Sequence, residues 1–430
     1  MPTIRTHRAR APLAKPMTAS AQDLGTALSP SGSAQAQPVK VAIMATHPIQ
    51  YQVPWYQHLT AQPGVAPHVY YAVLPTRQQQ GIGFGVSFAW DIPMFEGYGW
   101  SQLENRAGKP GLGSFFGANT PGIHAALAAN RPDVAIITGW QAYTLLQGIW
   151  ACMRLGIPMI VRAESNALRK RRWWVRILHK LLLSRFDACL AIGQANRQFY
   201  LGNGVAAAKI FSSHYFVDNQ RIGAQYESLA PARASLRQAW GIAADKICFV
   251  FAGKLQEKKR IMDLLHALKL AGEKRADLHL LVVGSGEQLE AAQGLVASGR
   301  LPVTFAGFLN QTDMPKAYAA ADCLVLPSDF GETWGLVVNE AMVCGLPAIV
   351  SDRVGCGPDL VSDGVTGLLF PFGDIEALAA CLLKMAAEPE ARAAMGARAR
   401  DRIADYSVQQ AVQGTLRAIH ATTHRRAQQP

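Results

Sequence analysis

The sequence predicts an α/β protein with two doubly wound, Rossmann-like domains that face each other across a cleft. Two blocks of short, nearly all-apolar segments alternate with helical patterns, and a polar stretch separates the two blocks. Short apolar strands that alternate with helices indicate a parallel sheet that is covered on both faces. The chain has 430 residues, 50% of them hydrophobic, which suits two medium-sized domains with cores of their own.

The first block begins at Val39, where residues 39–45 are typical of a buried first strand. Further strands are expected at 65–73, 133–138, 158–162, 188–192 and 210–213. Helical patterns lie between several of them, at 54–61, 122–129, 143–155 and 173–183. We therefore assign residues 39–218 to an N-terminal domain.

The alternation restarts after residues 219–245, a polar stretch with irregular apolar spacing that we interpret as the linker. Strands are expected at 247–252, 278–283, 303–306, 323–326 and 348–350. Helices are expected at 260–271, 287–297, 314–320, 337–344 and 375–387. Residues 246–400 then form a C-terminal domain, and 401–430 a final helix and tail. Because ligands bind at the carboxyl ends of parallel strands in such sheets, the cleft is the expected site.

Residues 1–38 are rich in Ala, Pro, Ser, Gln and Arg and contain no apolar run. They lack the hydrophobic centre of a secretory signal. Like a transit peptide they contain several Arg and few acidic residues, but we interpret them as a disordered extension. No run of about 18 apolar residues occurs, so we expect no membrane-spanning helix. The seven cysteines are scattered and none forms a CxxC pair. They are interpreted as reduced core residues of a cytosolic protein rather than a disulfide frame or a zinc site.

The net charge of +12 favours anionic partners such as nucleotide phosphates, acidic lipid head groups or nucleic acid. Residues 168–183 are both basic and aromatic, and on a helix Trp174, Ile177, Leu178 and Leu181 share one face. Such a segment can lie in an anionic membrane interface. An ordinary helix that faces the core with a solvated end remains the alternative. Nucleic-acid binding is not expected, because no known nucleic-acid module is present.

The stretch 328–342 carries the most chemical information in the chain. It follows a predicted strand, starts as a polar, Gly-containing loop and turns into a helix near Leu336. Glu332 therefore lies in the loop at the carboxyl end of a strand, and Glu340 lies about one turn into the helix. The free N–H groups at the start of that helix favour an anion. This arrangement suits sugar hydroxyls, a diphosphate and a ribose, in that order.

Two glutamates eight residues apart, in this aromatic-Gly-Leu and Glu-Ala-Met context, resemble the E-x7-E signature of the retaining, family-4-type glycosyltransferases (glycosyl transferases group 1), which have the GT-B fold. The basic loop 249–259 resembles the family's G-R-L-x-x-x-K segment, with Lys254 on the family's Arg and Lys259 on its Lys. A Lys at this position would still bind phosphate, but as a point charge without a bidentate fork.

Two later segments extend this resemblance. Residues 355–361 and 363–369 resemble the G-G-x-P-E and D-G-x-x-G-x-L motifs, with Asp359 in place of Glu. The resemblance is good from about Phe249 to Asp374 and thin over the N-terminal half.

The resemblance implies a retaining glycosyltransferase that uses a nucleotide-sugar donor and a glycan or lipid-linked acceptor. Glu332 would orient the donor sugar, Glu340 would accept from the ribose, and the segment around Phe308 would contact the nucleobase. The lysines and the first amides of the helix would neutralise the leaving diphosphate. The residues expected to bind the donor are Lys254, Lys259, Phe308, Gly335, Leu336, Val337 and Glu340.

The N-terminal half supplies the expected acceptor side of the cleft. The polar loop 46–54 follows the first strand, so His47 and Gln50 are expected to bind the acceptor, although a Pro-fixed turn in which His47 is only hydrogen-bonded is also consistent. Glu164 falls where many relatives carry a cleft His, and with Glu332 it is a candidate catalytic residue. A structural salt bridge between Glu164 and Arg162 is the alternative.

No Asp-x-Asp, the usual metal-binding signature of the other large transferase fold, occurs in the chain, so no metal is expected. No cofactor is expected either. The Gly-containing segment 282–287 lacks the third Gly of a dinucleotide fingerprint and is interpreted as a tight strand-to-helix turn, and the segment 81–85 is weaker still. A nucleotide-sugar epimerase or phosphorylase on the same fold and a non-catalytic glycan- or membrane-binding subunit are the alternative functions. The expected location is cytoplasmic, with the inner face of the plasma membrane as a candidate peripheral site.

Overall fold

A computed structural model describes residues 37–427, so the disorder expected for residues 1–38 lies outside the described part except at its last two positions. The first of its two sheets contains β1 (Val39–Ala45), β2 (Val65–Tyr71), β3 (Gly99–Gln102), β4 (Val134–Ile137), β5 (Met159–Val161), β6 (Ala188–Ala191) and β7 (Ile210–Ser212). The strands run parallel in the order β3-β2-β1-β4-β5-β6-β7.

The second sheet is also parallel, in the order β10-β9-β8-β11-β12-β13. Its strands are β8 (Ile247–Ala252), β9 (Leu278–Val283), β10 (Val303–Gly307), β11 (Cys323–Leu326), β12 (Ala348–Ser351) and β13 (Gly367–Phe370). The two doubly wound parallel sheets confirm the predicted fold class.

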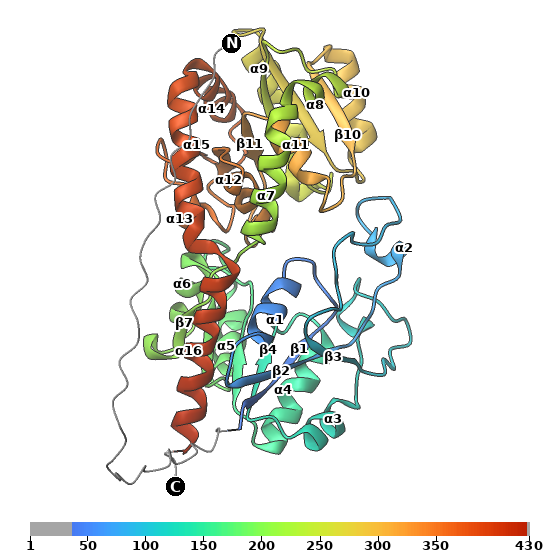
Figure 1. Ribbon diagram of the computed structural model, residues 1–430, viewed down its shortest axis with the longest axis vertical. Helices are drawn as coiled ribbons and strands as arrows, with labels where there is room; N and C mark the ends of the chain where they lie inside the picture. The colour runs from blue at the N-terminus through green and yellow to red at the C-terminus, as the bar shows by residue number, and fades with distance from the viewer. Residues whose placement is uncertain (1–36, 428–430) are drawn as a thin grey trace, which may run out of the picture. The chain divides into compact units, whose positions relative to one another are not determined.

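Helices cover both faces of each sheet (Figure 1). Those of the first half are α1 (Val53–Thr60), α2 (Arg77–Gln80), α3 (Ile123–Asn130), α4 (Tyr143–Leu155), α5 (Trp173–Leu183) and α6 (Gln194–Gly202). Those that follow are α7 (Asn219–Leu229), α8 (Arg233–Ala239), α9 (Ile261–Gly272), α10 (Leu289–Gly299), α11 (Met314–Ala320), α12 (Leu336–Val343), α13 (Gly357–Leu360), α14 (Ile375–Ala387), α15 (Pro389–Ile403) and α16 (Val408–Ala427). Short 3-10 turns are η1 (Phe115–Gly117), η2 (Ala207–Lys209), η3 (Ala230–Ala232), η4 (Glu257–Lys259) and η5 (Ala404–Tyr406).

The apolar runs form strands because they are buried from both sides. Along β1, Val41 and Ile43 pack in a core with α1 and α16, whereas Ala42 and Met44 pack in a second core with α3 and α4. A strand that is buried on both faces needs apolar side chains at every position, which is why its sequence does not alternate. All seven cysteines are free, and six are buried, which confirms that these six are core residues, whereas Cys381 is partly exposed.

Three features differ from the prediction. The stretch interpreted as a linker forms α7 and α8, whose helical pattern was hidden because Ile222 and Arg237 are their only buried side chains. Two edge strands were not predicted. The strand β3 has the sequence Gly-Trp-Ser-Gln, which contains no apolar run, and β13 overlaps the motif 363–369, which was matched to the family as a segment and not interpreted as a strand. Edge strands are covered less and therefore carry a weaker sequence signal.

The helix α16, drawn in red in Figure 1, packs against the first sheet rather than the second. The Trp55 indole N–H donates to Thr415 Oγ1 at 3.1 Å, and Ser213 Oγ donates to the Ala411 carbonyl at 3.0 Å. A side chain at Gly414 would lie 1.8 Å from the Ser212 carbonyl oxygen, so only Gly allows this close approach. The end of the chain therefore completes the core of the first domain.

Candidate functional site

Both sheets place their loops for ligand binding at one edge. In each sheet the strand order reverses, between β1 and β4 in the first and between β8 and β11 in the second. Loops diverge at such a point and leave a crevice at the carboxyl ends of the strands. His47 follows β1, Glu164 follows β5, Lys259 follows β8 and Glu332 follows β11.

A cavity of about 200 Å³ lies among these loops and joins residues of both sheets. Its lining consists of Tyr51, Glu164 and Tyr215 from the first domain and Lys259, Glu332, Thr333, Trp334, Gly335, Leu336 and Val337 from the second. The structure therefore brings together both candidate catalytic glutamates and four of the predicted donor-binding residues. We call this space the donor cavity, after the ligand that the sequence predicts for four of its residues.

Lys259 and Glu332 form an ion pair in the donor cavity. Both side chains are largely buried, with exposed fractions of 13% and 16%. The Glu332 backbone is fixed on both sides, because its N–H donates to the Asp329 carbonyl and its own carbonyl accepts from Gly355 N. A cation is thus held beside the carboxylate, where a phosphate oxygen can share it.

The start of α12 also lines the donor cavity. Gly335 caps the helix with a φ of 104°, and a side chain there would lie 2.8 Å from Leu326 Cδ2. Glycine adopts this left-handed backbone without steric cost. The helix therefore begins abruptly at Leu336, and the amides of Leu336 and Val337 belong to the first turn, which has no intrahelical acceptors.

Glu340 is buried behind the donor cavity and does not line it. Its Oε2 accepts from the Tyr318 hydroxyl at 2.6 Å, and its Oε1 accepts from the Tyr51 hydroxyl at 3.0 Å. Burial raises the pKa of the Glu340 carboxyl, and the two tyrosine hydrogen bonds oppose that rise. Since Tyr51 itself lines the cavity, it stands between Glu340 and any ligand there.

Glu164 accepts two hydrogen bonds and makes no ion pair with Arg162 among residues 37–427. Tyr215 donates to its Oε1 at 2.6 Å, and Thr333 of the other domain donates to its Oε2 at 3.0 Å. The Arg162 side chain instead lies against the rings of Trp55, Tyr215 and Phe216. The salt-bridge alternative is therefore wrong, and Glu164 is fixed by a contact that joins the two domains.

A second cavity of about 330 Å³ adjoins the first at the carboxyl ends of β1, β4 and β5. Glu164 and Thr333 line both cavities, so the two spaces meet at these side chains. The rest of its lining is Ala45, Thr46, His47, Ile49, Gln52, Thr138, Trp140, Gln141, Arg162, Ala163 and Ser165. We call this space the acceptor cavity.

The acceptor cavity contains His47 as predicted, but Gln52 lines it and Gln50 does not. The turn before α1, which begins at Val53, orients the Gln52 side chain toward the cavity. The sequence alone does not reveal which of the two nearby glutamines points inward. His47 Nδ1 lies 2.9 Å from Thr46 Oγ1. Burial lowers the pKa of His47 to about 4, so this imidazole is neutral at pH 7.

Lys254 and Phe308 lie in a different part of the site. Lys254 Nζ donates to the Ile82 carbonyl at 2.7 Å and lies 4.9 Å from the centre of the Phe84 ring. Phe308 packs against the rings of Phe84 and Phe88. Neither residue lines the donor cavity, because a segment of the first domain covers both.

The family model described as "Glycosyl transferases group 1" matches residues 232–402, and the one described as "Glycosyl transferase 4-like domain" matches residues 35–212. The chain belongs to the group 1 glycosyltransferase family. These two matched regions correspond to the two sheets and their helices.

Curated relatives resemble parts of the chain. D-inositol 3-phosphate glycosyltransferase of Saccharomonospora viridis is 37% identical over 197 residues, which are 43% of this chain and 45% of that protein. Sulfoquinovosyl transferase of Arabidopsis thaliana is 27% identical over 305 residues, 67% of this chain and 56% of that protein. The chain thus matches about half the length of these relatives.

A solved structure shows the fold over nearly the whole chain. The Anabaena protein HepE in complex with UDP and glucose has a TM-score of 0.67 and 16% sequence identity, and the match covers 89% of this chain and 100% of that one. This group 1 glycosyltransferase therefore has the GT-B fold.

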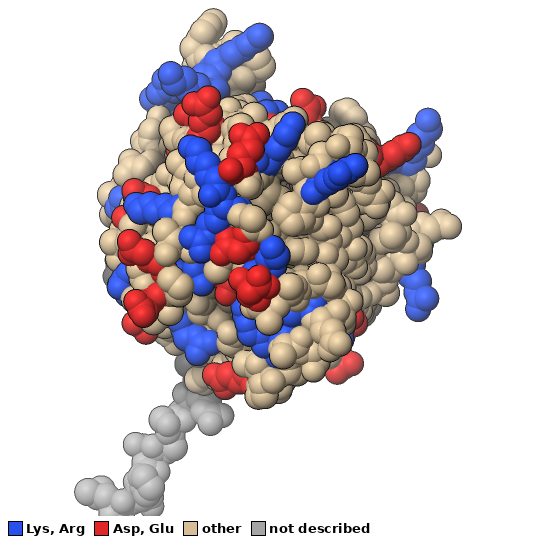
Figure 2. Space-filling model, turned by 90° about the horizontal axis from the view of Figure 1, so that it is seen from above, with Lys and Arg blue, Asp and Glu red and all other residues tan. Residues whose placement is uncertain are grey.

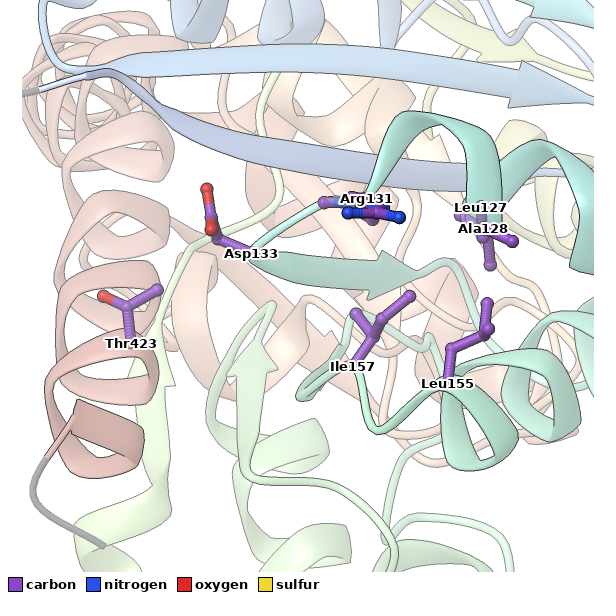
Figure 3. Close-up of a pocket in the computed structure, with 8 residues that line it drawn as sticks. Leu127, Ala128, Arg131, Asp133, Leu155, Ile157 and Thr423 are labelled. Carbon is purple, nitrogen blue, oxygen red and sulfur yellow. The ribbon is translucent and has the colours of Figure 1, made fainter. Parts of the chain in front are cut away.

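A cavity of about 690 Å³ lies at the opposite edge of the first sheet, beside the amino end of β4 (Figure 3). Its lining is Leu127, Ala128, Arg131, Pro132, Asp133, Leu155, Ile157 and Thr423. Asp133 already accepts a hydrogen bond from the Lys40 backbone N–H at 2.8 Å. None of the residues predicted to bind the donor or the acceptor lies there, so it is not the candidate active site.

The sequence interpretation missed the residues that hold the glutamates. Tyr51 and Tyr318 bond to Glu340, and Tyr215 and Thr333 bond to Glu164. Only Thr333 carried a local signal, because it follows Glu332 directly in the motif. Tyr51 bonds to Glu340 from 289 positions away and from the other domain. Tyr318 and Tyr215 bond to glutamates of their own domains, 22 and 51 positions away, so these pairs also have no local pattern.

Helix α5 presents an apolar face to solvent in this family member. Trp173 is 73% exposed, Leu178 57% and Leu181 58%, and only Leu183 of this helix is buried. The alternative of an ordinary core-facing helix is therefore wrong.

On the face shown in Figure 2, basic and acidic side chains are interspersed, so the positive charge is not gathered there.

The basic residues before α5 have two different environments. Arg172 and Arg176 are exposed. Arg171 instead donates to the Asn166 carbonyl at 2.7 Å and lies over the Phe199 ring at 4.8 Å. Arg171 thus holds the loop in place. None of the described helices is long and apolar enough to cross a membrane.

Proposed function

We propose that this protein transfers a sugar from a nucleotide-sugar donor to a glycan or lipid-linked acceptor, with retention of configuration and without a metal. The observation that carries the proposal is the donor cavity, where Lys259, Glu332 and the first amides of α12 meet Glu164 of the other domain. The complex of HepE with UDP and glucose and the names of the curated relatives support a donor and a reaction of this kind.

The donor diphosphate binds where positive charge and free amides converge. Lys259 and the N–H groups of Leu336 and Val337 line the same space, so they neutralise the charge that develops on the leaving group. When the diphosphate binds Lys259, it shares the ammonium group with Glu332 and weakens the ion pair between the two side chains. Its carboxylate then accepts from hydroxyls of the donor sugar.

The ribose approaches Glu340 by displacing Tyr51. Both oxygens of Glu340 accept from tyrosine hydroxyls, and Tyr51 is the partner that lines the donor cavity. A ribose hydroxyl replaces the Tyr51 hydroxyl, so the buried Glu340 side chain keeps both of its hydrogen bonds. An unpaired buried carboxylate would cost several kcal/mol of free energy, and an unpaired neutral acceptor about 1–3 kcal/mol. Donor binding is thereby coupled to the contact between the domains.

The acceptor enters through the acceptor cavity and meets the donor at Glu164 and Thr333. Neutral His47 and Gln52 line this cavity and can hydrogen-bond an acceptor with hydroxyl groups. The acceptor oxygen forms the new bond to the anomeric carbon on the face that the diphosphate leaves. The bond from that carbon to the diphosphate oxygen breaks, and this oxygen takes the acceptor proton. Closure of the domains excludes water and limits hydrolysis.

We further propose that α5 docks on an anionic membrane surface and brings the active site to a lipid-linked acceptor. Its exposed apolar face lies beside exposed basic residues, which is the pattern of a helix in a membrane interface. Arg169, which precedes the helix, lies 5.4 Å from the Phe330 ring of the Glu332 loop. The proposed membrane surface is thus directly linked to the donor loop.

A donor screen by saturation-transfer NMR, followed by product analysis with lipid-linked acceptors, tests the proposal. We expect one nucleotide sugar to bind and its sugar to appear on the acceptor in the same anomeric configuration. An epimerised nucleotide sugar or a free sugar phosphate as the main product would contradict glycosyl transfer and support the other enzyme classes. An inverted product would contradict retention alone.

A further inference from the structure

The segment 81–91 of the first domain reaches across to the second domain and is fixed there at both ends. Near its start, the Ile82 carbonyl accepts from Lys254 at 2.7 Å. At its end, Asn310 donates to the Ala89 carbonyl at 2.8 Å, and Thr312 N donates to Asp91 at 3.2 Å. The second-domain partners lie after β8 and after β10, at the carboxyl edge of that sheet.

Glycines explain how the segment takes this path. A side chain at Gly81 would lie 1.6 Å from the Val86 carbonyl oxygen, and Gly83 has a φ of 86°. A side chain at Gly83 would also lie 3.0 Å from Lys254 Cδ. The Gly-rich run therefore forms a tight turn over Lys254 rather than a nucleotide fingerprint of its own.

Three phenylalanine rings from both domains meet under this turn. Phe88 and Phe308 have ring centres 4.2 Å apart at 33°, and Phe84 meets Phe308 at 5.0 Å and 72°. Trp90 extends the group through an edge contact with Phe88 at 4.8 Å. Phe84 and Phe308 are partly exposed, whereas Phe88 is buried, so only the first two rings are accessible to a ligand.

Lys254 belongs to the basic loop 249–259, and its ammonium group lies over the Phe84 ring of this aromatic group. An ammonium group has three donors, and the Ile82 carbonyl takes one of them. The remaining two donors are available to phosphate oxygens. The Phe84 ring, whose centre lies 4.9 Å from Nζ, restricts where the ammonium can point.

We propose that the segment 81–91 completes the donor site: Phe84 forms with Phe308 an aromatic wall on which the nucleobase stacks, the buried Phe88 ring supports this wall, and the Ile82 carbonyl positions Lys254 for the diphosphate. This inference rests on the proposed function, since it requires a nucleoside diphosphate in the cleft. A base suits the wall because its flat face matches several rings at once. The wall contains residues of both domains, so the base is read only when the domains are together.

Calorimetry with the full-length protein tests the inference. The ligands are UDP, GDP and ADP, which differ only in the base, and inorganic pyrophosphate, which has none. The proteins are wild type, the double variant Phe84→Leu/Phe88→Leu, and Phe116→Leu, a control at a ring that is 67% exposed outside the site. A fourth variant, Asp91→Ala, keeps all the rings but removes an anchor to Thr312.

We expect the double variant to bind the preferred nucleoside diphosphate about tenfold or more weakly, because stacking on an aromatic ring contributes roughly this factor for each base. The preference among the three bases should shrink, while pyrophosphate binding stays unchanged. Asp91→Ala should show a smaller loss in the same direction, and Phe116→Leu none. The Asp91 variant also provides the test if the double variant does not fold.

Two results would overturn the inference while the proposed function stands. In the first, wild type binds a nucleoside diphosphate, and the variants bind it with the same affinity and the same preference among the bases. The other is an equal loss for pyrophosphate in the double variant, which would show that the rings do not bind the base. A wild-type protein that binds none of the three nucleotides would overturn the proposed function, and the inference with it.

Discussion

Replacing Leu178 and Leu181 of α5 by Ser tests whether this helix lies in a membrane interface. Both side chains belong to the exposed apolar face, with exposed fractions of 57% and 58%. In water they make few contacts, so their loss should change the free energy of unfolding by less than about 0.5 kcal/mol each. On a membrane they would be buried, and their loss should weaken binding.

The size of the membrane effect follows from the exposed surface. Burying a whole Leu side chain contributes roughly 1.5–3 kcal/mol. Since somewhat more than half of each side chain is exposed here, membrane burial contributes about 1 kcal/mol for each. The double variant should therefore bind vesicles about 2 kcal/mol more weakly, a factor of roughly thirty.

Vesicle sedimentation provides the assay, with phosphatidylglycerol vesicles and neutral vesicles compared at low and high salt. Wild type should bind the anionic vesicles, and salt should weaken this binding because it screens the basic residues. Phe116→Ser is the matched control, since Phe116 is 67% exposed but lies outside α5. Charge reversal at Arg172 and Arg176, both exposed, should also release the protein without unfolding it.

The reasoning is refuted if the double Ser variant binds anionic vesicles as tightly as wild type. It is also refuted if wild type binds neither kind of vesicle, because the exposed face would then have another partner. Arg171 is not a suitable position for charge reversal, since its hydrogen bond to the Asn166 carbonyl holds the loop and its loss would alter the fold.

Four further outcomes are expected at the active site. Lys259→Ala should weaken nucleoside diphosphate binding and turnover by about 2–4 kcal/mol, whereas Lys258→Ala, an exposed neighbour, should change neither in calorimetry and rate assays. Glu332→Gln should chiefly lower kcat and Glu340→Gln chiefly raise the donor KM, once circular dichroism shows both folded; the reverse pattern would exchange sugar and ribose. Activity should survive excess EDTA, and a loss restored by magnesium or manganese would contradict the metal-free mechanism. Burial lowers the pKa of His47 from its ordinary value of 6.5 to about 4 in the folded protein. Between pH 6.5 and pH 4 the imidazole is therefore protonated in the unfolded chain but not in the folded one, so the free energy of unfolding falls as the pH falls. His47→Gln should reduce the loss of unfolding free energy between about pH 7 and pH 5 by about 2 kcal/mol, and an unchanged loss would show that His47 is not buried in its neutral form.

Local sequence patterns were sufficient to predict the two-sheet architecture and the donor motif. Runs such as β8 and β9 are almost entirely apolar because parallel strands are buried on both faces, so their positions could be predicted from the apolar runs alone. Lys259 and Glu332 could be found because each lies in a loop after a strand and matches a motif of the family, and the carboxyl ends of neighbouring parallel strands meet at one edge.

The tertiary structure decided what depends on contacts between distant residues. Tyr51 and Glu340 are 289 positions apart, so no local pattern links the tyrosine hydroxyl to the carboxylate that it covers. The pairing of Lys254 with Ile82 spans 172 positions and arises where the two domains meet. The exposure of α5 was equally undetermined, because an amphipathic helix has the same pattern whether its apolar face meets a core, a membrane or water. Local sequence sets which side chains a strand or helix offers, whereas the packing of whole domains sets which of them meet.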